Sequence, residues 1–428
     1  MSKSKMTPLQ TDRATERAQY AKTVLDNGIR VVSETIPHVR SASIGVWAEV
    51  GSRDENENCN GISHFLEHMV FKGTKKRSVL DIAQSLESLG GYLNAFTTKE
   101  QTCFYARVLD SNIEEAMDVL ADLLLNATFK KEEIEKERLV VVEELRSAED
   151  DPEDIIHDYF EKALFPRHSL GFPIIGTEAN LRRFQRGDLR SHVAMYYLPT
   201  RLVIAAAGNV NHHMLVKLVE RYFKNLRMNG SVPQKRQSGP TAASKASRTE
   251  YARPINQAHI CMGTVGYSIR HKNRYPLLIL NALLGEGMSS RLYQSIREHH
   301  GLAYSVYSFV SMLSDTGVFG TYVGTEKKNV AAALELVHRE LDRIKTRPIS
   351  RAELDRTKSQ IKGTMMLGLE NMSGRMIRLG SSELYFESYI SLDSILKRVD
   401  GVTPEAIMYT ANDLFNEDDF TTVIIHPS

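Results

Sequence analysis

The chain has 428 residues, and its 54 Lys and Arg residues almost balance its 53 Asp and Glu residues, giving a net charge of +1. This balance gives no electrostatic reason to expect nucleic acid or a membrane surface as a partner. No apolar run reaches the length of a membrane span, so we expect no membrane segment. The length allows two or more domains with substantial cores.

The cysteines and the first residues bear on the compartment. Cys59, Cys103 and Cys261 are odd in number and widely spaced, so they predict no disulfide framework. The first 20 residues are polar and carry charges of both signs, without the apolar run of a signal peptide. We therefore expect a cytoplasmic protein, with the mitochondrial matrix as the open alternative.

The first predicted elements are a strand at 41–50 and a helix that contains the run His64-Phe65-Leu66-Glu67-His68. Histidines four apart lie on one face of a helix, so both imidazoles can bind one metal ion, usually zinc. Glu67 flanks the pair, which suits a general base acting on a metal-bound water. For this motif alone, a solvated helix with two surface histidines is the alternative.

The third metal ligand is predicted on a long helix at 130–146, which contains no Gly or Pro. At about 100° per residue, Ile134, Val141 and Leu145 form one apolar stripe. Glu144 flanks this stripe, and Glu137 lies two turns earlier, almost in line with it. The geometry favours Glu144 as the ligand and Glu137 as a carboxylate that orients the site. A half-buried salt bridge is the alternative role for Glu144.

An acidic run at 149–158 follows this helix. Pro152 can open a new helix at its first turn, and Asp154 and Asp158 would then lie four apart on one face. Two carboxylates in this arrangement could hold an arginine of a substrate. The alternative is that acidic residues simply favour a helix start through the helix dipole.

The chain divides into two diverged copies. Residues 227–254 contain many Ser, Gly, Pro and Ala residues and predict a linker between a first domain at 1–226 and a second at 255–428. Each copy runs strand, helix, hairpin, helix, long helix and strand, so we predict an α+β fold of two homologous α/β-layer domains. At an offset of 217 (64 + 217 = 281), His64 corresponds to Asn281 and His68 to Gly285. The second copy therefore lacks the metal ligands.

Four motifs resemble the insulinase-like (pitrilysin) zinc peptidases, and most of all the β-subunit of the mitochondrial processing peptidase and its bacterial relatives. The histidine motif is followed by Phe71-Lys72-Gly73-Thr74, and Glu144 stands 76 positions after His68 (144 − 68 = 76), as the family spacing requires. Residues 90–97 are similar to the family's substrate-binding edge strand, and residues 285–292 to its glycine-containing loop. Arg297 and Tyr304 match its arginine–tyrosine pair, seven positions apart.

The resemblance implies specific roles for these residues. One Zn²⁺ per chain would be held by His64, His68 and Glu144, with Glu67 as general base. Substrate would bind as an added strand along Asn94, Ala95 and Phe96. By the same resemblance, Arg297 and Tyr304 would contact the substrate near the scissile bond, and Asp154 and Asp158 would select a basic residue. Arg297 ending a helix before Gly301, and Tyr304 packing in a strand, are the alternatives.

The resemblance also implies an assembly and a reaction. We expect a homodimeric zinc metalloendopeptidase in which Arg297 and Tyr304 of one subunit complete the metal site of the other. A closed chamber would limit substrates to peptides or unfolded segments. Two other classes stay open: a non-catalytic subunit of a processing-peptidase-like complex, and a heterodimeric peptidase whose partner supplies the arginine–tyrosine pair.

Overall fold

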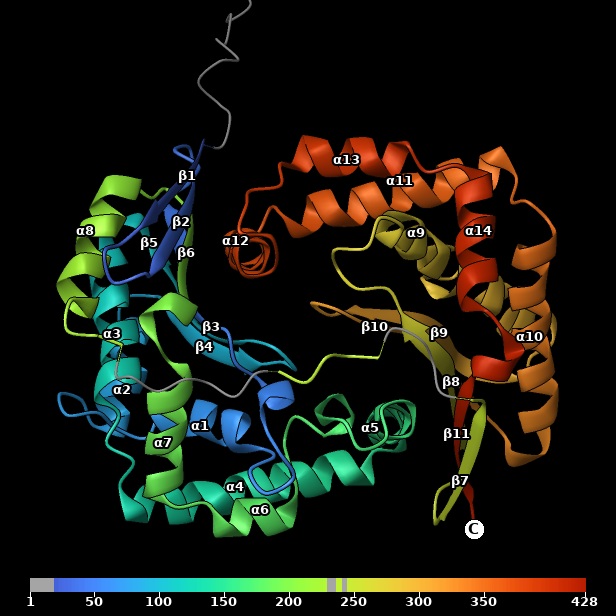
Figure 1. Cartoon of the computed structure of the whole chain (residues 1–428), viewed down its shortest axis with the longest axis horizontal. Coiled ribbons are helices and arrows are strands. Elements are labelled where there is room, and N and C mark those ends of the chain that lie inside the picture. Colours follow the sequence, from blue (N-terminus) through green and yellow to red (C-terminus); the bar gives the residue numbers. More distant parts are fainter. Residues whose placement is uncertain (1–18, 229–235, 241–244) are drawn as a thin grey trace, which may run out of the picture.

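The computed structural model describes residues 19–228, 236–240 and 245–428. It consists of two mixed sheets with helices packed around each (Figure 1). Parts of the predicted linker, at 229–235 and 241–244, lie outside the described residues. The first sheet has the strand order β1-β2-β6-β3-β5-β4. Its strands are β1 (Gln19–Val24), β2 (Arg30–Thr35), β3 (Ser41–Ala48), β4 (Tyr92–Thr97), β5 (Thr102–Leu109) and β6 (Leu202–Gly208).

The second sheet repeats the topology of the first. Its order is β7-β11-β8-β10-β9, which matches β2-β6-β3-β5-β4 strand for strand, and the pairs β2–β6 and β7–β11 are the parallel ones. The two homologous α+β domains predicted from sequence are thereby confirmed. The strands are β7 (Ser247–Arg253), β8 (Ala258–Gly266), β9 (Ala303–Met312), β10 (Gly317–Thr325) and β11 (Thr421–Pro427).

Most helices stay with the sheet of their own half. In the first half these are α1 (Ile62–Val70), α2 (Val79–Glu87), α3 (Ile113–Asn126), α4 (Lys131–Asp150), α6 (Glu178–Arg183), α7 (Arg186–Tyr196) and α8 (His212–Phe223). In the second half they are α9 (Arg274–Gly285), the π-helical turn η5 (Tyr293–His299), α10 (Val330–Thr346), α11 (Arg351–Gly368), α13 (Leu392–Asp400) and α14 (Pro404–Leu414). Short 3₁₀ turns lie at Ser52–Asp54, Asp110–Asn112, Ser169–Gly171, Pro199–Arg201, Lys327–Asn329 and Glu417–Asp419.

Two helices cross to the sheet of the other half. Helix α5 (Pro152–Leu164) packs on β8 and β11, and helix α12 (Met372–Phe386) packs on β2, β3 and β6, as Figure 1 shows. Both contacts are apolar: Phe160 joins the core of the second sheet, and Met376 packs with Trp47 of the first. Each of these two helices covers part of the sheet of the other half. The halves are therefore joined by apolar packing as well as by the linker.

The structure corrects the end of the predicted linker. Ser247–Arg253, assigned to the linker at 227–254, is strand β7 and pairs in parallel with β11. The strand lies at the edge of the sheet, and its residues alternate between exposed and half-buried. An edge strand of this kind carries few large apolar residues, so its sequence is hard to distinguish from a loop.

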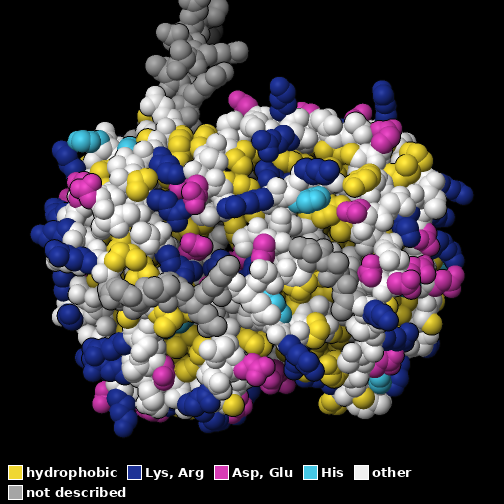
Figure 2. All heavy atoms as spheres, viewed as in Figure 1, with side chains coloured by type: hydrophobic (Ala, Val, Ile, Leu, Met, Phe, Trp, Pro, Cys, Tyr) yellow, Lys and Arg dark blue, Asp and Glu magenta, His cyan; other side chains and the backbone are white. Residues whose placement is uncertain are grey.

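The surface agrees with the balanced composition. On the face drawn in Figure 2, Lys and Arg side chains are interspersed with Asp and Glu side chains, without a large region of one sign. Among the described residues, no helix combines the length and the apolar character needed to cross a bilayer.

Candidate metal centre

Helix α1 starts at a tight contact that fixes its direction. Its N-cap residue, Gly61, has φ +96°, and a Cβ atom there would lie 2.6 Å from the carbonyl oxygen of Ile175. Glycine is therefore required by both conformation and space. Phe65 and Met69 are fully buried against the core, so the opposite face of α1 presents its histidines. The structure places His64 and His68 together, with ring centroids 4.8 Å apart.

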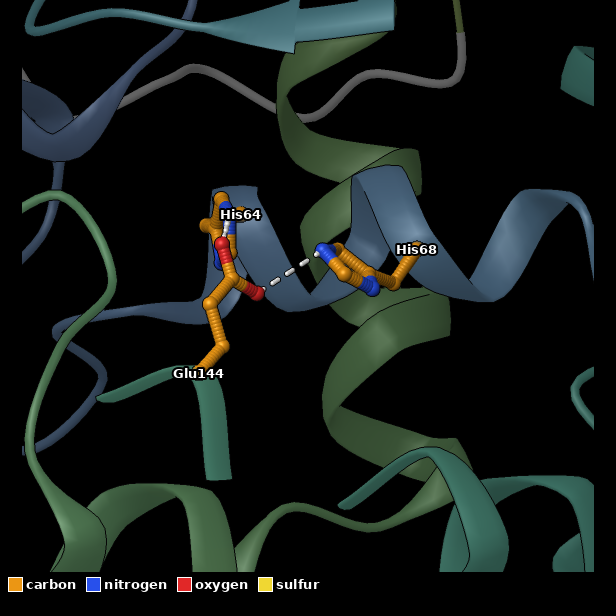
Figure 3. A group of neighbouring side chains, drawn as sticks. All are labelled: His64, His68 and Glu144. Carbon is orange, nitrogen blue, oxygen red and sulfur yellow. Dashed lines mark ion pairs between the residues drawn. The ribbon is translucent and has the colours of Figure 1, made fainter. Parts of the chain in front are cut away.

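Helix α4 brings Glu144 to this histidine pair (Figure 3). The apolar stripe predicted from sequence, including Val141, is buried and anchors the helix. Glu144 Oε1 lies 3.7 Å from His64 Nε2, and Glu144 Oε2 lies 3.4 Å from His68 Nε2. Two donors each about 2.0–2.1 Å from a tetrahedral zinc ion are about 3.3–3.4 Å apart. The spacing of the side chains therefore fits one zinc ion.

The protonation of His64 suits metal binding, whereas burial at His68 is outweighed by the surrounding carboxylates, which raise the pKa of that imidazole. Burial, helped by the neighbouring His68, lowers the pKa of His64 to about 4, so its imidazole is neutral at physiological pH. Neutral imidazole is the form that binds a metal. His64 and His68 are the kind of nitrogen ligands, and Glu144 the kind of oxygen ligand, that occur in catalytic zinc sites. Three protein ligands leave a fourth position open for water.

Glu137 orients the second histidine, in the arrangement predicted from sequence. Its Oε1 lies 2.9 Å from His68 Nδ1, and its Oε2 lies 2.7 Å from Nζ of Lys72. Glu137 is only 4% exposed. Burial alone would raise the pKa of its carboxyl, but the contacts with His68 and Lys72 outweigh it and lower the pKa. Sequence reasoning missed the contact of Lys72, because only the fold places the end of α1 beside α4.

The carboxylate–histidine contact leads to a first prediction. Glu137→Gln should weaken zinc binding by about tenfold or more, since partners of this kind typically contribute 10–100-fold to metal affinity. The amide would also place N–H groups against Lys72. Competition with a chromogenic chelator measures the zinc affinity directly. Glu135→Gln is the matched control, because Glu135 lies on the same helix but pairs with Arg138. Equal affinity of the two variants would contradict the assigned role.

Glu67 is held beside the metal ligands by the first sheet. The hydroxyl of Thr97, at the end of β4, donates to Glu67 Oε2 at 2.5 Å. Burial raises the pKa of the Glu67 carboxyl above its usual range. The carboxylate lines the same cavity as His64 and Glu144. The geometry therefore places a fixed carboxylate next to the three candidate ligands.

The cavity at the metal centre lies between the halves and has a volume of about 860 Å³. Its first-half wall includes the end of β4 and the turn to β5, and its second-half wall includes Ser311, Met312 and Leu313 of β9 and the following turn. Both exchanged helices contribute as well, α5 through Asp158 and α12 through Tyr385. Any molecule bound at the metal ligands would thus contact both halves.

Strand β4 is an edge strand, because β5 is its only partner in the sheet. Ala95 and Phe96 line the cavity, and Phe96 packs edge-on against Trp47 with centroids 5.5 Å apart. Asn94 is placed one residue earlier, where its amide donates to the hydroxyl of Tyr92. Strand β4 thus has the unpaired edge that binding of an added strand would require.

The two acidic residues predicted to select a basic substrate residue, Asp154 and Asp158, lie in different surroundings. Asp158 lines the cavity, whereas Asp154 is exposed and is not part of its lining. Burial raises the pKa of Asp158 to about 6, although Lys99 opposes the shift. The cavity contains a further carboxylate, Glu161, which is paired with Lys99 at 2.7 Å. Sequence reasoning missed Glu161, since it depends on the packing of α5 across the halves.

Arg297 and Tyr304 lie together but outside this cavity. Arg297 donates to the carbonyl oxygen of Tyr304 at 2.8 Å, and its guanidinium lies 4.7 Å from the centre of the Tyr304 ring. Tyr304 is 76% exposed. Along β9 it lies eight residues from Met312 (312 − 304 = 8), which corresponds to about 26 Å at the usual rise of a strand. Within one chain, the pair is therefore far from the β9 end that lines the cavity.

The fold and the three converging side chains define a two-domain protein with a candidate metal centre in its first half. Residues 30–178 match the family described as "Insulinase (Peptidase family M16)", and residues 183–361 match the "Peptidase M16 inactive domain". The chain is 42% identical over 404 residues to the uncharacterized zinc protease YmxG of Bacillus subtilis, covering 94% of this chain and 97% of the relative. The chain belongs to the insulinase family, peptidase family M16.

Other relatives and solved structures agree. An uncharacterized zinc protease of Rickettsia bellii is 34% identical over 408 residues, covering 94% of this chain and 97% of the relative. The crystal structure of a protease from Helicobacter pylori shares the fold with a TM-score of 0.90 at 24% identity, covering 96% of this chain and all of that one. A peptidase M16 inactive domain from Pseudomonas fluorescens shares it with a TM-score of 0.88 at 19% identity, covering 96% and 98%.

Proposed function

We propose that this protein is a zinc metalloendopeptidase that hydrolyses peptides or unfolded protein segments. The observation that carries the proposal is the convergence of His64, His68 and Glu144 at distances that fit one zinc ion, with Glu67 beside them. The relatives named zinc proteases support the same metal and reaction. One zinc ion per chain follows from the single ligand set among the described residues.

The chemistry follows from the residue types. A zinc ion bound here would lower the pKa of its water to about 7 and polarise a peptide carbonyl. Glu67 takes a proton from the attacking water and delivers it to the leaving amine, as a general base and then a general acid. Thr97 holds the Glu67 carboxylate in place through its hydrogen bond. His68 is oriented by Glu137, so the ligand geometry is fixed before substrate arrives.

The proposed substrate is an extended chain added along the free edge of β4. Main-chain pairing tolerates varied side chains, and the short Ala95 side chain lets a peptide backbone approach closely. The cavity of about 860 Å³ between the halves would accept a peptide segment but no folded domain. We propose that the assembled enzyme encloses this cavity in a chamber, which would restrict substrates to peptides and unfolded segments.

A peptide library tests the reaction. The zinc-loaded protein should cut a mixed library, a chelator should stop the cutting, and added zinc should restore it, with products read by mass spectrometry. Glu144→Ala should neither retain zinc nor cut. Cutting that survives the chelator would contradict a metal-dependent mechanism, and no cutting by zinc-loaded protein would favour a partner-dependent or non-catalytic subunit.

We further propose a preference for basic peptides, in which Asp158 contributes more than Asp154. Asp158 lines the cavity, whereas Asp154 does not. Asp158→Asn should lower the selectivity for Arg-containing over Arg-free peptides by about tenfold, since a charge-assisted pair would be lost. Asp154→Asn, the matched control, should change it less.

The same preference should depend on pH. The pKa of Asp158 is raised to about 6 by burial, so its carboxylate is charged above that pH and neutral below it. Selectivity for Arg-containing peptides should therefore fade as the pH falls through about 6, while Asp158→Asn shows no such fall. An unchanged peptide ranking in Asp158→Asn would remove this residue from the specificity site.

For assembly, we propose a homodimer in which Arg297 and Tyr304 of one subunit reach the metal centre of the other. Within one chain the pair is outside the cavity, and Tyr304 is largely exposed. Mixed dimers of Glu67→Gln and Arg297→Ala should regain part of the parent rate, because one of the two shared centres would be intact. Mass spectrometry of the mixture verifies mixed dimers. No recovery in verified mixed dimers would favour a heterodimer whose partner supplies these residues.

A further inference from the structure

A hollow lined by three arginines lies in the second half, separate from the metal centre. Its volume is about 770 Å³. It is bounded by the loop between β8 and α9, the loop between α12 and α13, and the first turn of α13. The arginines are Arg270, Arg274 and Arg398, and the hydroxyl-bearing residues beside them are Ser388, Ser391 and Ser394.

None of these arginines forms an ion pair with a carboxylate among the described residues. Arg270 uses its Nε to donate to the carbonyl oxygen of Tyr385 at 2.8 Å, and its terminal nitrogens have no hydrogen-bond partner in the part of the chain that the structure describes. Arg398 has no recorded hydrogen bond and lies 5.9 Å from the ring centre of Tyr275. Glu387 is the one acidic residue in the lining, so three positive charges face one negative charge.

A second arginine-rich hollow in the same half shows the usual alternative. It has a volume of about 700 Å³ and is lined by Arg291, Arg339 and Arg343 among others. Each of these three is paired with a carboxylate: Glu353 at 2.9 Å, Glu335 at 2.8 Å and Glu340 at 2.6 Å. Arg347, also in that lining, has no ion pair among the described residues, so three of the four arginines there have a carboxylate partner, whereas none of the three in the first hollow does.

The surroundings favour a compact anion with several oxygens. Arg274 is held in place by protein contacts: its Nη1 donates to the carbonyl oxygen of Ile269 at 2.8 Å, its Nη2 donates to the hydroxyl of Tyr275 at 3.1 Å, and its guanidinium lies 4.9 Å from the ring centre of Phe386. Guanidinium groups pair with phosphate through parallel N–H donors. Helix α13, nine residues long, begins at the wall of the hollow with Ser391 as its N-cap, and adds partial positive charge there.

The two aromatic rings that line this hollow, those of Phe386 and Tyr389, pack against other side chains of the protein. Phe386 carries Arg274 on its face, and Tyr389 stacks on Tyr20 with centroids 4.3 Å apart. Each of these rings therefore already has a packing partner on one face. We propose that the hollow binds a small phosphate anion, inorganic phosphate or pyrophosphate, through Arg270, Arg274 and Arg398. The proposal is independent of the peptidase reaction.

The location gives the site a connection to the metal cavity. Arg270 holds the main chain of Tyr385, and the side chain of Tyr385 lines the cavity at the metal centre. On the first-half side, Lys22 donates to the carbonyl oxygen of Glu387 at 2.9 Å. An anion here would join the β8–α9 loop to the loop that follows α12, the helix that covers the first sheet.

Calorimetric titration of the full chain with pyrophosphate tests the proposal. Binding should survive removal of zinc with a chelator within about twofold, because the arginines lie outside the metal centre. The double variant Arg270→Gln with Arg398→Gln should bind at least about tenfold more weakly, which corresponds to about 1.4 kcal/mol. Both side chains are exposed, so the variant should fold, and its thermal transition checks this. Arg274 is left intact because it also supports the loop.

The controls separate this site from other sources of anion binding. Arg339 lines the second hollow, where it pairs with Glu335, so Arg339→Gln should bind pyrophosphate as the parent does. Binding that disappears with zinc would mean that the anion is a metal ligand and would overturn the proposal. Equal binding by the parent and the double variant would do the same. A nucleoside diphosphate should bind no more tightly than pyrophosphate, and tenfold tighter binding would overturn the assignment to a small anion.

Discussion

Glu67→Gln should bind zinc as tightly as the parent protein but hydrolyse peptides about 10²–10⁴-fold more slowly. Glutamine keeps the size of the side chain and can still accept the hydrogen bond that Thr97 donates to Glu67. It cannot take a proton from water, so the loss belongs to the proton transfer and not to metal binding. The rate on a single fluorogenic peptide, measured beside zinc content per chain, separates these two effects.

The matched control for this variant is Glu143→Gln. Glu143 stands next to the proposed ligand Glu144, but it is exposed and pairs with Arg146 at 2.8 Å. Its variant should keep both the zinc and the rate of the parent. If Glu67→Gln retained more than a tenth of the parent rate, Glu67 would not be the general base. If it lost zinc, its role would be structural.

The local part of the metal centre could be predicted from the sequence. Histidines four apart on a helix share a face, and the apolar stripe of Ile134, Val141 and Leu145 fixes which way Glu144 and Glu137 point. The structure brings His64, His68 and Glu144 together, with Glu137 at His68. Which side chains share a face of α1, and which share a face of α4, follows from helix geometry alone. The contact between the two helices depends on the fold and could not be read from either segment.

Residues that depend on the exchanged helices could not be predicted in this way. Asp154 and Asp158 are four apart on α5, yet only Asp158 lines the cavity. The sequence shows which residues share a helix face, but not that α5 leaves its own half to pack on β8 and β11. The same crossing places Glu161 in the cavity and pairs it with Lys99 of the β4–β5 turn. Strand β7 was missed for a related reason, because its partner β11 lies at the far end of the chain.

The contact between the halves is centred on a buried arginine. Arg53 has a side chain that is 1% exposed, and it lies 2.6 Å from Glu100 and 2.7 Å from Asp315. Glu100 lies in the turn between β4 and β5, and Asp315 lies in the equivalent turn between β9 and β10. Arg53 also donates to the carbonyl oxygen of Gln237 in the linker at 2.8 Å. One cation therefore holds together the two corresponding hairpins and the linker.

Arg53→Met should lower the free energy of unfolding by about 3 kcal/mol, because the buried Glu100 would lose its nearest counter-charge and keep Arg236, 3.9 Å away, as its other cation. Glu100 is 1% exposed and would bear most of this cost. At about 2.1 cal/mol/K per residue over 428 residues, the corresponding fall in Tm should be about 3 °C, measured by calorimetry. Arg40→Met is the control, since Arg40 is 82% exposed and pairs with Asp110 at the surface, where such pairs contribute little.

The effect of Arg53→Met should reach the metal cavity as well as the stability. The turn that carries Glu100 directly follows the end of β4, where Thr97 holds Glu67. The opposite turn follows Met312, which lines the other wall. Loosening both turns should therefore reduce the peptidase rate below the transition temperature while zinc stays bound by α1 and α4. Equal Tm values for Arg53→Met and Arg40→Met would show that the arginine does not join the halves, and the cavity would then depend on the exchanged helices α5 and α12 for its shape.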